Sequence, residues 1–339
     1  MKSLVCEEPN RFTMKDLDIP SLKEGEALIR IRRIGICGTD FHAYRGRQPF
    51  FTYPRILGHE LSGEIAEIPA NAGDFTVGDQ VVIIPYLECG KCIACLSGKT
   101  NCCTELELIG VHIDGGMQEY LAVPITHLMK TNDITLEQAA TVECLSIGAH
   151  AVRRADLKKA EFAIVIGAGP IGLGVMKYAK LAGAQVIAVD MNEQRLDFCR
   201  KWAEVDFTVN AANGDALEEI KKITNGDFAT AVFDVTGNVN SMNNSYTFAS
   251  NGGRLIFVGL VQADFSFPDP EFHRRELTLL SSRNATKEDL EHVVQSIRQG
   301  QVNTDSFITS KTSFQEIMEK FETFMEPESN TIKAMITID

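Results

Sequence analysis

Four cysteines between residues 89 and 103 have the spacing of metal ligands. Three thiolates within seven residues can surround one ion only on a tightly curled loop, and a fourth sulfur then completes a tetrahedron. Four sulfur ligands leave no open position, so the pattern predicts a structural zinc site rather than a catalytic one. Cys102 is an alternative to Cys103 as the fourth ligand. In C-x2-C-x2-C-x7-C order the predicted ligands are Cys89, Cys92, Cys95 and Cys103.

A second set of candidate ligands is dispersed along the chain. Cys37 stands in the segment GICGTDFH just after a predicted strand, His59 and Glu60 stand in GHE, and Glu143 lies far downstream. One thiolate, one imidazole and one carboxylate, together with a water, form an open zinc site of the catalytic kind. Taken singly, His59 is more typical of a core or surface histidine, and Cys37 of a small buried apolar residue. Spacing alone does not decide between these interpretations.

The segment GAGPIG at residues 167–172 follows a predicted strand and opens a predicted helix. Gly167 permits a tight turn, Gly169 lets the backbone approach a pyrophosphate, and Gly172 lets helix and strand pack closely. The free N–H groups at the helix start favour the diphosphate. Asp190 ends the next strand, where a carboxylate accepts hydrogen bonds from ribose hydroxyls and repels a 2′-phosphate. This context favours an NAD site over an incidental glycine turn. Further predicted contacts of the cofactor are Pro170, Ile171, Arg195 and Val258.

Two patterns of elements must position these residues. Up to about Val123 the chain has short β-segments, such as 27–34 and 79–84, separated by glycine and proline, and a helical stretch follows at 134–151. From Ala160 strands and helices alternate, which favours a parallel sheet with both faces covered. We expect the tail to return to the first domain. Its predicted elements are helices near 287–299 and 314–325 and a strand at 333–338. In the alternating part, strands are predicted at 162–166, 185–189, 230–235 and 254–258, and helices from the glycine turn to residue 181 and over 193–202.

Length and composition limit the class of protein. At 339 residues, two domains are expected. Lys+Arg 33 against Asp+Glu 46 gives a net charge of −13, which disfavours nucleic acid and anionic membrane surfaces as partners. No apolar run has the length of a bilayer span and no leader pattern is present, so we expect a cytoplasmic protein. The count of nine cysteines in a large chain favours thiolate–metal chemistry over disulfides.

Together, GICGTDFH, GHE, the four-cysteine segment and GAGPIG with Asp190 resemble the zinc-containing medium-chain alcohol dehydrogenase family. The resemblance covers essentially the whole chain, with the motifs in family order. It implies a GroES-like β-rich catalytic domain at residues 1–147, to which 285–339 returns. It also implies a doubly wound Rossmann domain with a parallel sheet at 148–284. Two zinc ions per chain, NAD and a homodimeric or homotetrameric assembly are the expected cofactors and quaternary structure.

The same resemblance implies roles for the dispersed ligands. Cys37 and His59 match the first two ligands of the catalytic zinc. Glu60 and Glu143 match two glutamates that can supply the third, in exchange with water. Cys144 follows Glu143 where relatives usually have proline, and that departure places Glu60 ahead of Glu143.

A proton relay is also implied. Thr39 matches the hydroxyl beside the metal, and His42 matches the outer member of the relay. Zinc then acts as a Lewis acid on the alcohol, Thr39 takes the alcohol proton, and the cofactor ribose passes the proton to His42. Hydride moves to the nicotinamide. The alternative for His42 is an exposed loop histidine without a role.

A finer resemblance concerns the substrate. Four segments look most like the L-galactonate and L-gulonate 5-dehydrogenases of the polyol and sugar-acid branch. This implies oxidation of a secondary hydroxyl of a sugar acid to a keto acid. The segments are QPFF at 48–51, GVHIDGG at 110–116, PEFH at 270–273 and SRNAT at 282–286.

An anionic substrate requires a cation or backbone amides. Arg283 and His112 are the candidates, and Arg45, Arg47 and Arg55 are alternatives. Arg283 is equally a candidate contact of the cofactor or of the domain interface, and His112 a support for its loop.

Other classes remain to be separated. A sorbitol, other polyol or L-threonine 3-dehydrogenase is the nearest alternative. Zinc-free quinone reductases share the fold but lack the cysteine segment and the Cys37–His59 pair. A non-catalytic binding protein has no use for an open metal site. Metal content discriminates this last class, because an enzyme of the predicted kind binds two zinc ions per chain and a scaffold binds one.

Overall fold

The computed structural model of the protein describes all 339 residues, except for the side chain of Pro327. The chain forms two compact units. The N-terminal unit comprises Met1–Glu143 and Thr286–Asp339, and the second unit comprises Cys144–Ala285. These divisions lie a few residues from the domain boundaries expected from the sequence.

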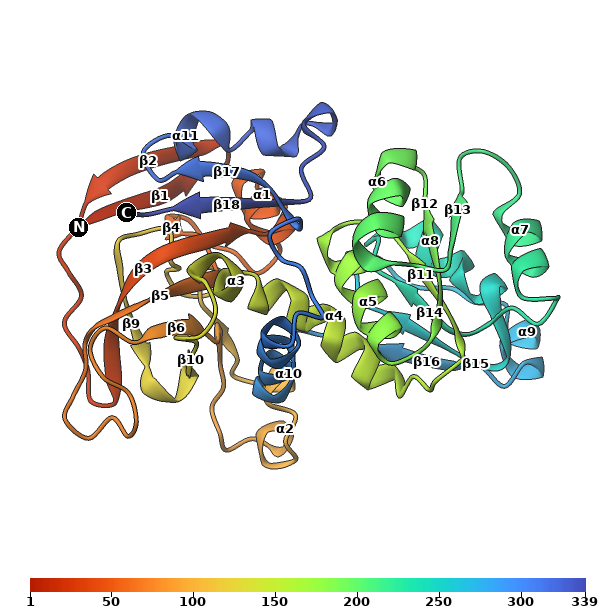
Figure 1. Cartoon of the computed structure of the whole chain (residues 1–339), viewed down its shortest axis with the longest axis horizontal. Coiled ribbons are helices and arrows are strands. Elements are labelled where there is room, and N and C mark those ends of the chain that lie inside the picture. Colours follow the sequence, from red (N-terminus) through yellow and green to blue (C-terminus); the bar gives the residue numbers. More distant parts are fainter. The chain divides into compact units, whose positions relative to one another are not determined.

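The N-terminal unit is rich in β-strands, and β1 to β6, β9 and β10 are labelled in Figure 1. Consecutive residues are buried along much of β1, β3, β5 and β18, whereas buried and half-buried residues alternate along β9. The strands are β1 (Lys2–Glu8), β2 (Arg11–Asp16), β3 (Glu26–Ile36), β4 (Arg55–Ile56), β5 (Glu60–Glu67), β6 (Gln80–Ile83), β7 (Tyr86–Leu87), β8 (Glu107–Leu108), β9 (Tyr120–Pro124), β10 (Leu128–Lys130), β17 (Ile308–Ser313) and β18 (Lys333–Thr337).

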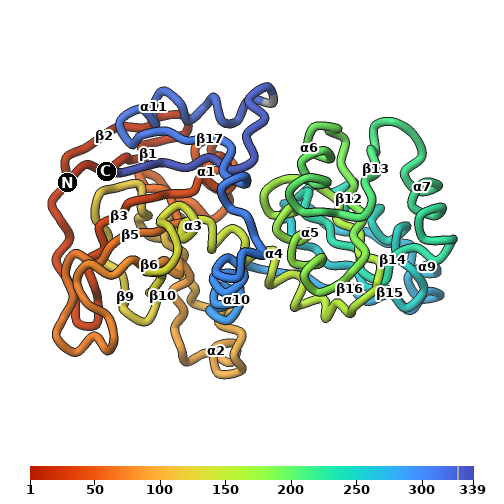
Figure 2. The backbone as a smooth tube through the Cα atoms, in the orientation of Figure 1, coloured from red at the N-terminus to blue at the C-terminus, as the bar shows by residue number. Residues whose placement is uncertain are grey.

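The main sheet of this unit has the order β10-β6-β5-β3-β18-β17, and β9 also pairs with β3. All of these pairs are antiparallel except β17 with β18. Ile29, Ile31 and Ile34 of β3 are fully buried and pack in the core of the unit against residues such as Leu61 of β5. Figure 2 shows the C-terminal backbone, in blue, returning among the red strands of the N-terminus.

The register of β3 sets the position of the candidate ligands. Gly35 pairs with Glu60 on β5, and Ile36 pairs with Ala334 on β18. Residues at the carboxyl end of β3 therefore have the start of β5 on one side and the start of β18 on the other, although these segments are far apart in the sequence.

Two sequence expectations for the helices of the N-terminal unit need correction. A single helix over 314–325 is wrong, because only Ile317–Lys320 is α-helical and a 3-10 turn follows at Thr323–Met325. The expected helical stretch at 134–151 is interrupted at Thr141. The helices are α1 (Gly38–Tyr44), α2 (Ile93–Leu96), α3 (Leu136–Ala140), α10 (Lys287–Arg298) and α11 (Ile317–Lys320), and α4 (Val142–Ala155) continues into the second unit.

The second unit contains a parallel sheet in the order β13-β12-β11-β14-β15-β16. In chain order this is 3-2-1-4-5-6, the doubly wound Rossmann arrangement, in which ligands bind at the carboxyl ends of the strands where the order reverses. The strands are β11 (Phe162–Ile166), β12 (Gln185–Asp190), β13 (Phe207–Asn210), β14 (Ala229–Asp234), β15 (Ala249–Phe257) and β16 (Thr278–Ser281). The helices are α5 (Pro170–Leu181), α6 (Glu193–Phe198), α7 (Ala216–Ile223), α8 (Val239–Asn244) and α9 (Asp269–Arg274).

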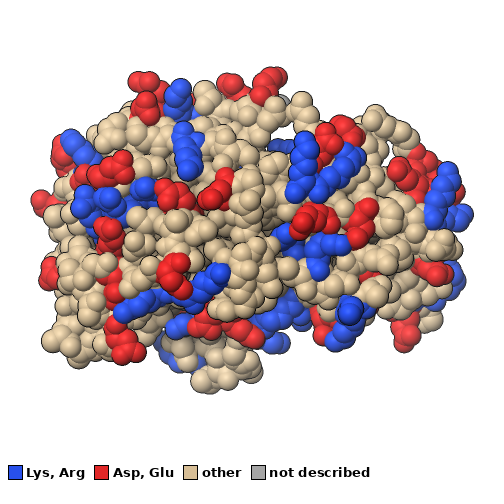
Figure 3. Space-filling model, viewed as in Figure 1, with Lys and Arg blue, Asp and Glu red and all other residues tan. Residues whose placement is uncertain are grey.

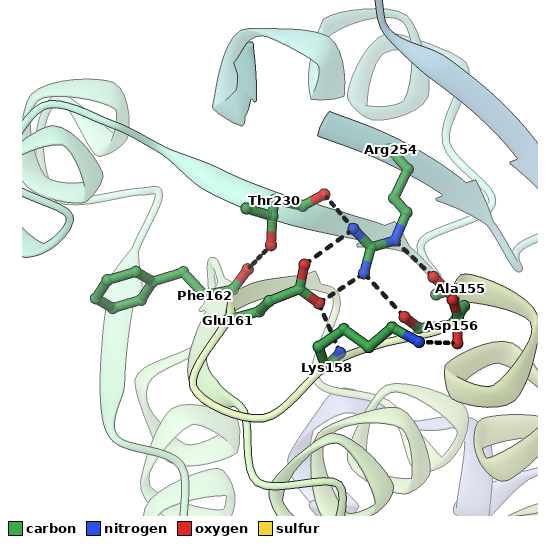
Figure 4. Close-up of polar contacts among 7 residues, drawn as sticks. All are labelled: Ala155, Asp156, Lys158, Glu161, Phe162, Thr230 and Arg254. Carbon is green, nitrogen blue, oxygen red and sulfur yellow. Dashed lines mark hydrogen bonds and ion pairs between the residues drawn. The ribbon is translucent and has the colours of Figure 1, made fainter. Parts of the chain in front are cut away.

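Arg254 of β15 joins the end of α4 to the sheet of the second unit (Figure 4). Its Nε donates to the carbonyl oxygen of Ala155 at 2.5 Å, and its two terminal nitrogens donate to the carboxylate of Glu161 at 3.2 and 2.7 Å. The pair is largely buried, with side chains 19% and 20% exposed. One guanidinium thus satisfies a helix C-terminus and a carboxylate together.

The surface carries both signs of charge. On the face drawn in Figure 3, Lys and Arg side chains are interspersed with Asp and Glu. Among the helices of the described residues, none has both the length and the apolar character that crossing a bilayer requires.

Candidate metal centres and cofactor site

The four predicted structural ligands lie together. One ligand atom from each of Cys89, Cys92, Cys95 and Cys103 is within 4.8 Å of the others. The N–H of Cys89 donates to the sulfur of Cys103 at 3.3 Å, and the sulfurs of Cys92 and Cys95 are 3.5 Å apart. Cys102 is exposed and does not belong to this group. The structure therefore favours Cys103 over Cys102 as the fourth ligand.

The electrostatics of this loop fit a cation. Backbone N–H groups of Cys95 and Thr104 lower the pKa of Cys92 to about 5. Desolvation and the neighbouring thiols raise the pKa of Cys95 to about 12. Cys92 therefore ionises more readily than a free thiol, whereas ionisation of Cys95 beside it is disfavoured unless a positive charge compensates it. A zinc ion bound by four thiolates supplies that charge.

The dispersed ligands also converge. One ligand atom from each of Cys37, His59 and Glu60 lies within 4.8 Å of the other two. Cys37 is the N-cap of α1 directly after β3, and Glu60 begins the adjacent strand β5. His59 and Glu60 are only 4% and 1% exposed. Antiparallel pairing of β3 with β5 thus unites residues that the sequence separates.

Asp40, which the sequence interpretation did not single out, supports two of these ligands. Its carboxylate accepts the N–H of Cys37 at 2.8 Å and the N–H of Gly58 at 3.2 Å, and lies 3.8 Å from Nδ1 of His59. Burial raises the pKa of Asp40. Burial disfavours protonation of His59, but the nearby Cys37 and Asp40 raise its pKa well above the usual value. The site thus concentrates negative groups around one imidazole, which suits a bound cation.

Glu143 lies near this cluster but has a different partner. The hydroxyl of Tyr86 donates to a carboxylate oxygen of Glu143, and both residues are buried. Burial raises the pKa of Glu143. The group of converging ligands within the described residues includes Glu60 and not Glu143.

A buried lysine faces Glu60. Lys333 of β18 is 1% exposed, and its Nζ lies 2.6 and 2.8 Å from the two carboxylate oxygens of Glu60. Sequence reasoning missed this residue. The available signal was a lysine inside the apolar run IKAMITI, where a charged residue is unusual unless it is paired.

The donor set of the dispersed cluster fits zinc. A thiol, an imidazole and a carboxylate are the usual ligands of an open zinc site. Nδ1 of His59 is buried without a hydrogen-bond partner among the described residues. The two residues predicted to form a proton relay, Thr39 and His42, share one face of α1, because they are three positions apart. Thr39 is half-buried and His42 is exposed.

The glycine turn has the geometry expected of a dinucleotide site. Gly167 follows β11 with a φ of +105°, and its N–H donates to Val189 at 2.8 Å. A Cβ on Gly172 would lie 1.9 Å from the carbonyl oxygen of Gly167, so helix and turn contact closely. A Cβ on Gly169 would meet only Arg195 Nη1, at 3.8 Å, which leaves room in front of the start of α5. The space fits a pyrophosphate at a helix N-terminus.

The other predicted cofactor residues lie around the carboxyl ends of the strands. Asp190 ends β12 and accepts the N–H of Ala168 at 2.7 Å and the N–H of Asn192 at 2.9 Å. Because a carboxylate has about four lone-pair positions, it can still accept ribose hydroxyls. Pro170 and Ile171 form the first turn of α5, Val258 follows β15, and Arg195 is exposed on α6.

The predicted substrate residues are not all in one unit. His112 belongs to the N-terminal unit, where its Nδ1 accepts the N–H of Leu108 at 2.9 Å. Arg283 is an exposed residue of the second unit. Arg55 lies 3.4 Å from Asp114 and donates to Thr52 at 2.9 Å. A loop-supporting role for His112 therefore has a structural basis, and Arg55 already has an acidic partner.

Comparisons with known families identify the family of the chain. A family model described as the alcohol dehydrogenase GroES-like domain matches residues 23–133, and one described as zinc-binding dehydrogenase matches residues 170–299. The chain belongs to the zinc-type alcohol dehydrogenase family. The predicted combination of a GroES-like and a Rossmann domain is thus confirmed. The protein is an oxidoreductase, as its sequence predicts.

Similar proteins of this family include enzymes of sugar-acid metabolism. The chain is 42% identical over 337 residues to the L-galactonate-5-dehydrogenase of Escherichia coli K12, covering 99% of each chain. It is 32% identical to the 2-dehydro-3-deoxy-L-galactonate 5-dehydrogenase of Pseudoalteromonas atlantica over 92% of this chain and 91% of that one. The crystal structure of the alcohol dehydrogenase RspB from E. coli CFT073 with NADH has a TM-score of 0.93 and 28% identity, covering 100% of this chain and 99% of that one.

Proposed function

We propose that the protein is a zinc-dependent, NAD-linked dehydrogenase that oxidises a secondary hydroxyl of a sugar acid, of the L-galactonate or L-gulonate type, to a keto acid. The observation that carries the substrate class is the 42% identity over 99% of both chains to an L-galactonate-5-dehydrogenase. The convergence of Cys37, His59 and Glu60 supports the chemistry.

Cys37, His59 and Glu60 would hold the catalytic zinc, with Glu143 as the alternative carboxylate. When bound, the zinc supplies Lewis acidity that lowers the pKa of an alcohol hydroxyl, and NAD supplies a hydride acceptor. Asp40 holds the backbone beside both ligands, because its carboxylate accepts the N–H of Cys37 and the N–H of Gly58, which precedes His59. A ligand fixed from behind in this way keeps its direction when substrate enters.

Thr39 and His42 would move the proton of the alcohol. The half-buried Thr39 hydroxyl would accept this proton while donating its own proton onward, and His42 on the same face of α1 would release a proton to solvent at the outer end of the relay. The exposure of His42 suits the outer position of a relay.

Asp190 would select NAD. Its carboxylate is held at the end of β12 by two backbone N–H groups. A fixed negative charge accepts ribose hydroxyls and repels the 2′-phosphate of NADP.

The substrate class is tested with a panel of hexonates, neutral polyols and L-threonine, in which NADH formation is followed by absorbance. L-galactonate or L-gulonate is expected to give the highest kcat/KM. A higher value with sorbitol or L-threonine would assign the protein to the alternative dehydrogenases. Absence of turnover with every substrate, despite two bound zinc ions, would favour a binding protein instead.

Arg283 is proposed to bind the substrate carboxylate, with His112 as a second candidate. Arg283→Ala is expected to raise KM by about tenfold for a hexonate, the effect of roughly 1.4 kcal/mol, and to leave KM for the matching neutral polyol unchanged. His112→Ala tests the second candidate by the same comparison of KM for the hexonate and for the neutral polyol. Equal losses on both substrates would remove Arg283 from carboxylate binding.

A further inference from the structure

Lys333 carries a basic side chain, yet it is buried almost as completely as the apolar residues of the core. It begins β18 and is 1% exposed. Its Nζ donates to both carboxylate oxygens of Glu60, at 2.6 and 2.8 Å, and to the carbonyl oxygen of Ile36 at 3.1 Å. An ammonium has three protons, so these three oxygens match its donor capacity.

A glycine on the strand between the two residues makes this contact possible. Lys333 lies on β18 and Glu60 on β5, with β3 between them. At the crossing point β3 carries Gly35, which pairs with Glu60 on one side and with Met335 on the other. A Cβ at Gly35 would lie 2.0 Å from a carboxylate oxygen of Glu60. The missing side chain of Gly35 therefore leaves the space through which the lysine and the glutamate meet.

The ammonium of Lys333 and a metal ion would both bind the carboxylate of Glu60. Glu60 has one ligand atom within 4.8 Å of the ligand atoms of Cys37 and His59. An oxygen that already accepts a short, charge-assisted hydrogen bond is a weaker electron donor toward a second cation. A carboxylate behind a histidine ligand strengthens that ligand, and a lysine behind a glutamate ligand has the opposite effect.

We propose that Lys333 is a positioning residue that restrains Glu60, so that Glu60 is an exchangeable third ligand and one coordination position stays open for substrate. This inference rests on the metal site of the proposed function. Stability alone is a poor explanation of the pair, because a buried ion pair rarely stabilises a fold more than apolar residues of the same volume.

The test is the rate at which a chelator in excess removes zinc from the protein, followed by absorbance of the chelator. Lys333→Met removes the charge and keeps the length of the side chain. Without its competitor Glu60 should bind the metal permanently, and zinc release from the dispersed site should slow by about tenfold or more. In protein loaded with Co²⁺, the visible spectrum should change toward that of a fully protein-ligated ion. Lys333→Arg should restore the original rate and spectrum.

Two controls assign the effect. The release phase that disappears in Cys37→Ala identifies the dispersed site, and the phase of the four-cysteine site is the internal reference. In a Glu60→Gln background, Lys333→Met should have no further effect on zinc release, because the lysine acts through the glutamate. Should Lys333→Met fold poorly, Lys333→Gln provides a second uncharged variant.

Opposite results overturn the proposal. Faster or unchanged release in both uncharged variants would mean that Lys333 has only a structural role, and so would an effect of Lys333→Met that persists in the Glu60→Gln background. A wild-type protein without any Cys37-dependent zinc would instead refute the metal site itself. Failure of the inference therefore shows in the zinc-release rates of the variants, whereas failure of the proposed function shows in the zinc content of the wild-type protein.

Discussion

The two metal-ligating clusters of the N-terminal unit are assembled in opposite ways. The four-cysteine cluster comes from one loop, and its members lie between residues 89 and 103. The cluster of Cys37, His59 and Glu60 comes from the ends of neighbouring strands, and its Glu60 contacts Lys333, which is 273 residues away in the sequence. Three of the four loop cysteines are only partly buried, whereas His59 and Glu60 are buried.

This difference separates a site that the chain forms locally from a site that requires the completed fold. The loop closes a full set of sulfur ligands, which suits a structural role. The dispersed cluster combines different donors in a buried place, and one of them, Glu60, also accepts hydrogen bonds from a buried lysine. A local site should fail alone when it is altered, and a dispersed site should respond to changes made far away in the sequence.

The largest effect is expected from Cys37→Ala. Removing a ligand of the dispersed site should lower kcat/KM by at least about 10³-fold, since Lewis acidity contributes several kcal/mol to such a reaction. Zinc content should fall from two ions per chain to one, because the four-cysteine group remains. Mass spectrometry of the native protein and steady-state kinetics measure the two quantities. Retention of two zinc ions with full activity would contradict the assignment of Cys37.

A smaller effect, on stability, is expected at the local site. Cys103→Ala should remove the structural zinc and destabilise the fold by about 4 kcal/mol, the scale of losing a bound metal. That corresponds to a Tm lower by roughly 10 °C for a unit of this size. The matched variant Cys102→Ala alters the exposed neighbour and should change neither zinc content nor Tm. If Cys102→Ala instead lowered the zinc content and the Tm, and Cys103→Ala changed neither, Cys102 would be the fourth ligand.

The smallest effect is expected from an ion pair that belongs to neither metal-ligating cluster, and it concerns the free energy of unfolding. Arg254→Met leaves the largely buried Glu161 and the carbonyl oxygen of Ala155 without their donor. We expect a loss of about 2 kcal/mol in the free energy of unfolding, measured by urea denaturation. Lys158→Met is the matched control, because its partner Asp156 is exposed and such pairs contribute little. A midpoint as low in Lys158→Met as in Arg254→Met would show that burial does not determine the strength of these pairs.

The glycine turn and the doubly wound sheet were predictable from sequence because their signals are local. Gly167, Gly169 and Gly172 stand between a strand and a helix in one short segment, and the observed φ of Gly167 and the close contact of Gly172 follow from those residue types. The four-cysteine cluster was predictable for the same reason, and the structure adds the choice of Cys103.

Contacts across the fold explain what the sequence did not predict. The spacing of Phe314, Ile317 and Phe321 is helical, but Phe321 packs in an aromatic cluster with Phe12 and Tyr44, and the helix is limited to one turn. Short α1 begins at a turn that Asp40 closes by accepting the N–H of Cys37.

Asp40, Tyr86 and Lys333 were not predicted as site residues. Each acts on a ligand that is remote in sequence or hidden by the fold: Asp40 contacts His59, Tyr86 contacts Glu143 and Lys333 contacts Glu60. No spacing rule connects a lysine of β18 with a glutamate of β5, since only the order of the strands brings them together.

The position of β18 in the sheet has a consequence for synthesis on the ribosome. The segment of β3 from Arg33 to Ile36 pairs with β18, which is translated only after the whole parallel sheet of residues 162–281. Until then the nascent chain presents an unpaired strand edge beside its metal ligands, a feature that promotes association between chains. A chain that ended before Lys333 would keep this edge of β3 unpaired, so we expect such truncated chains to associate with one another more readily than the full chain.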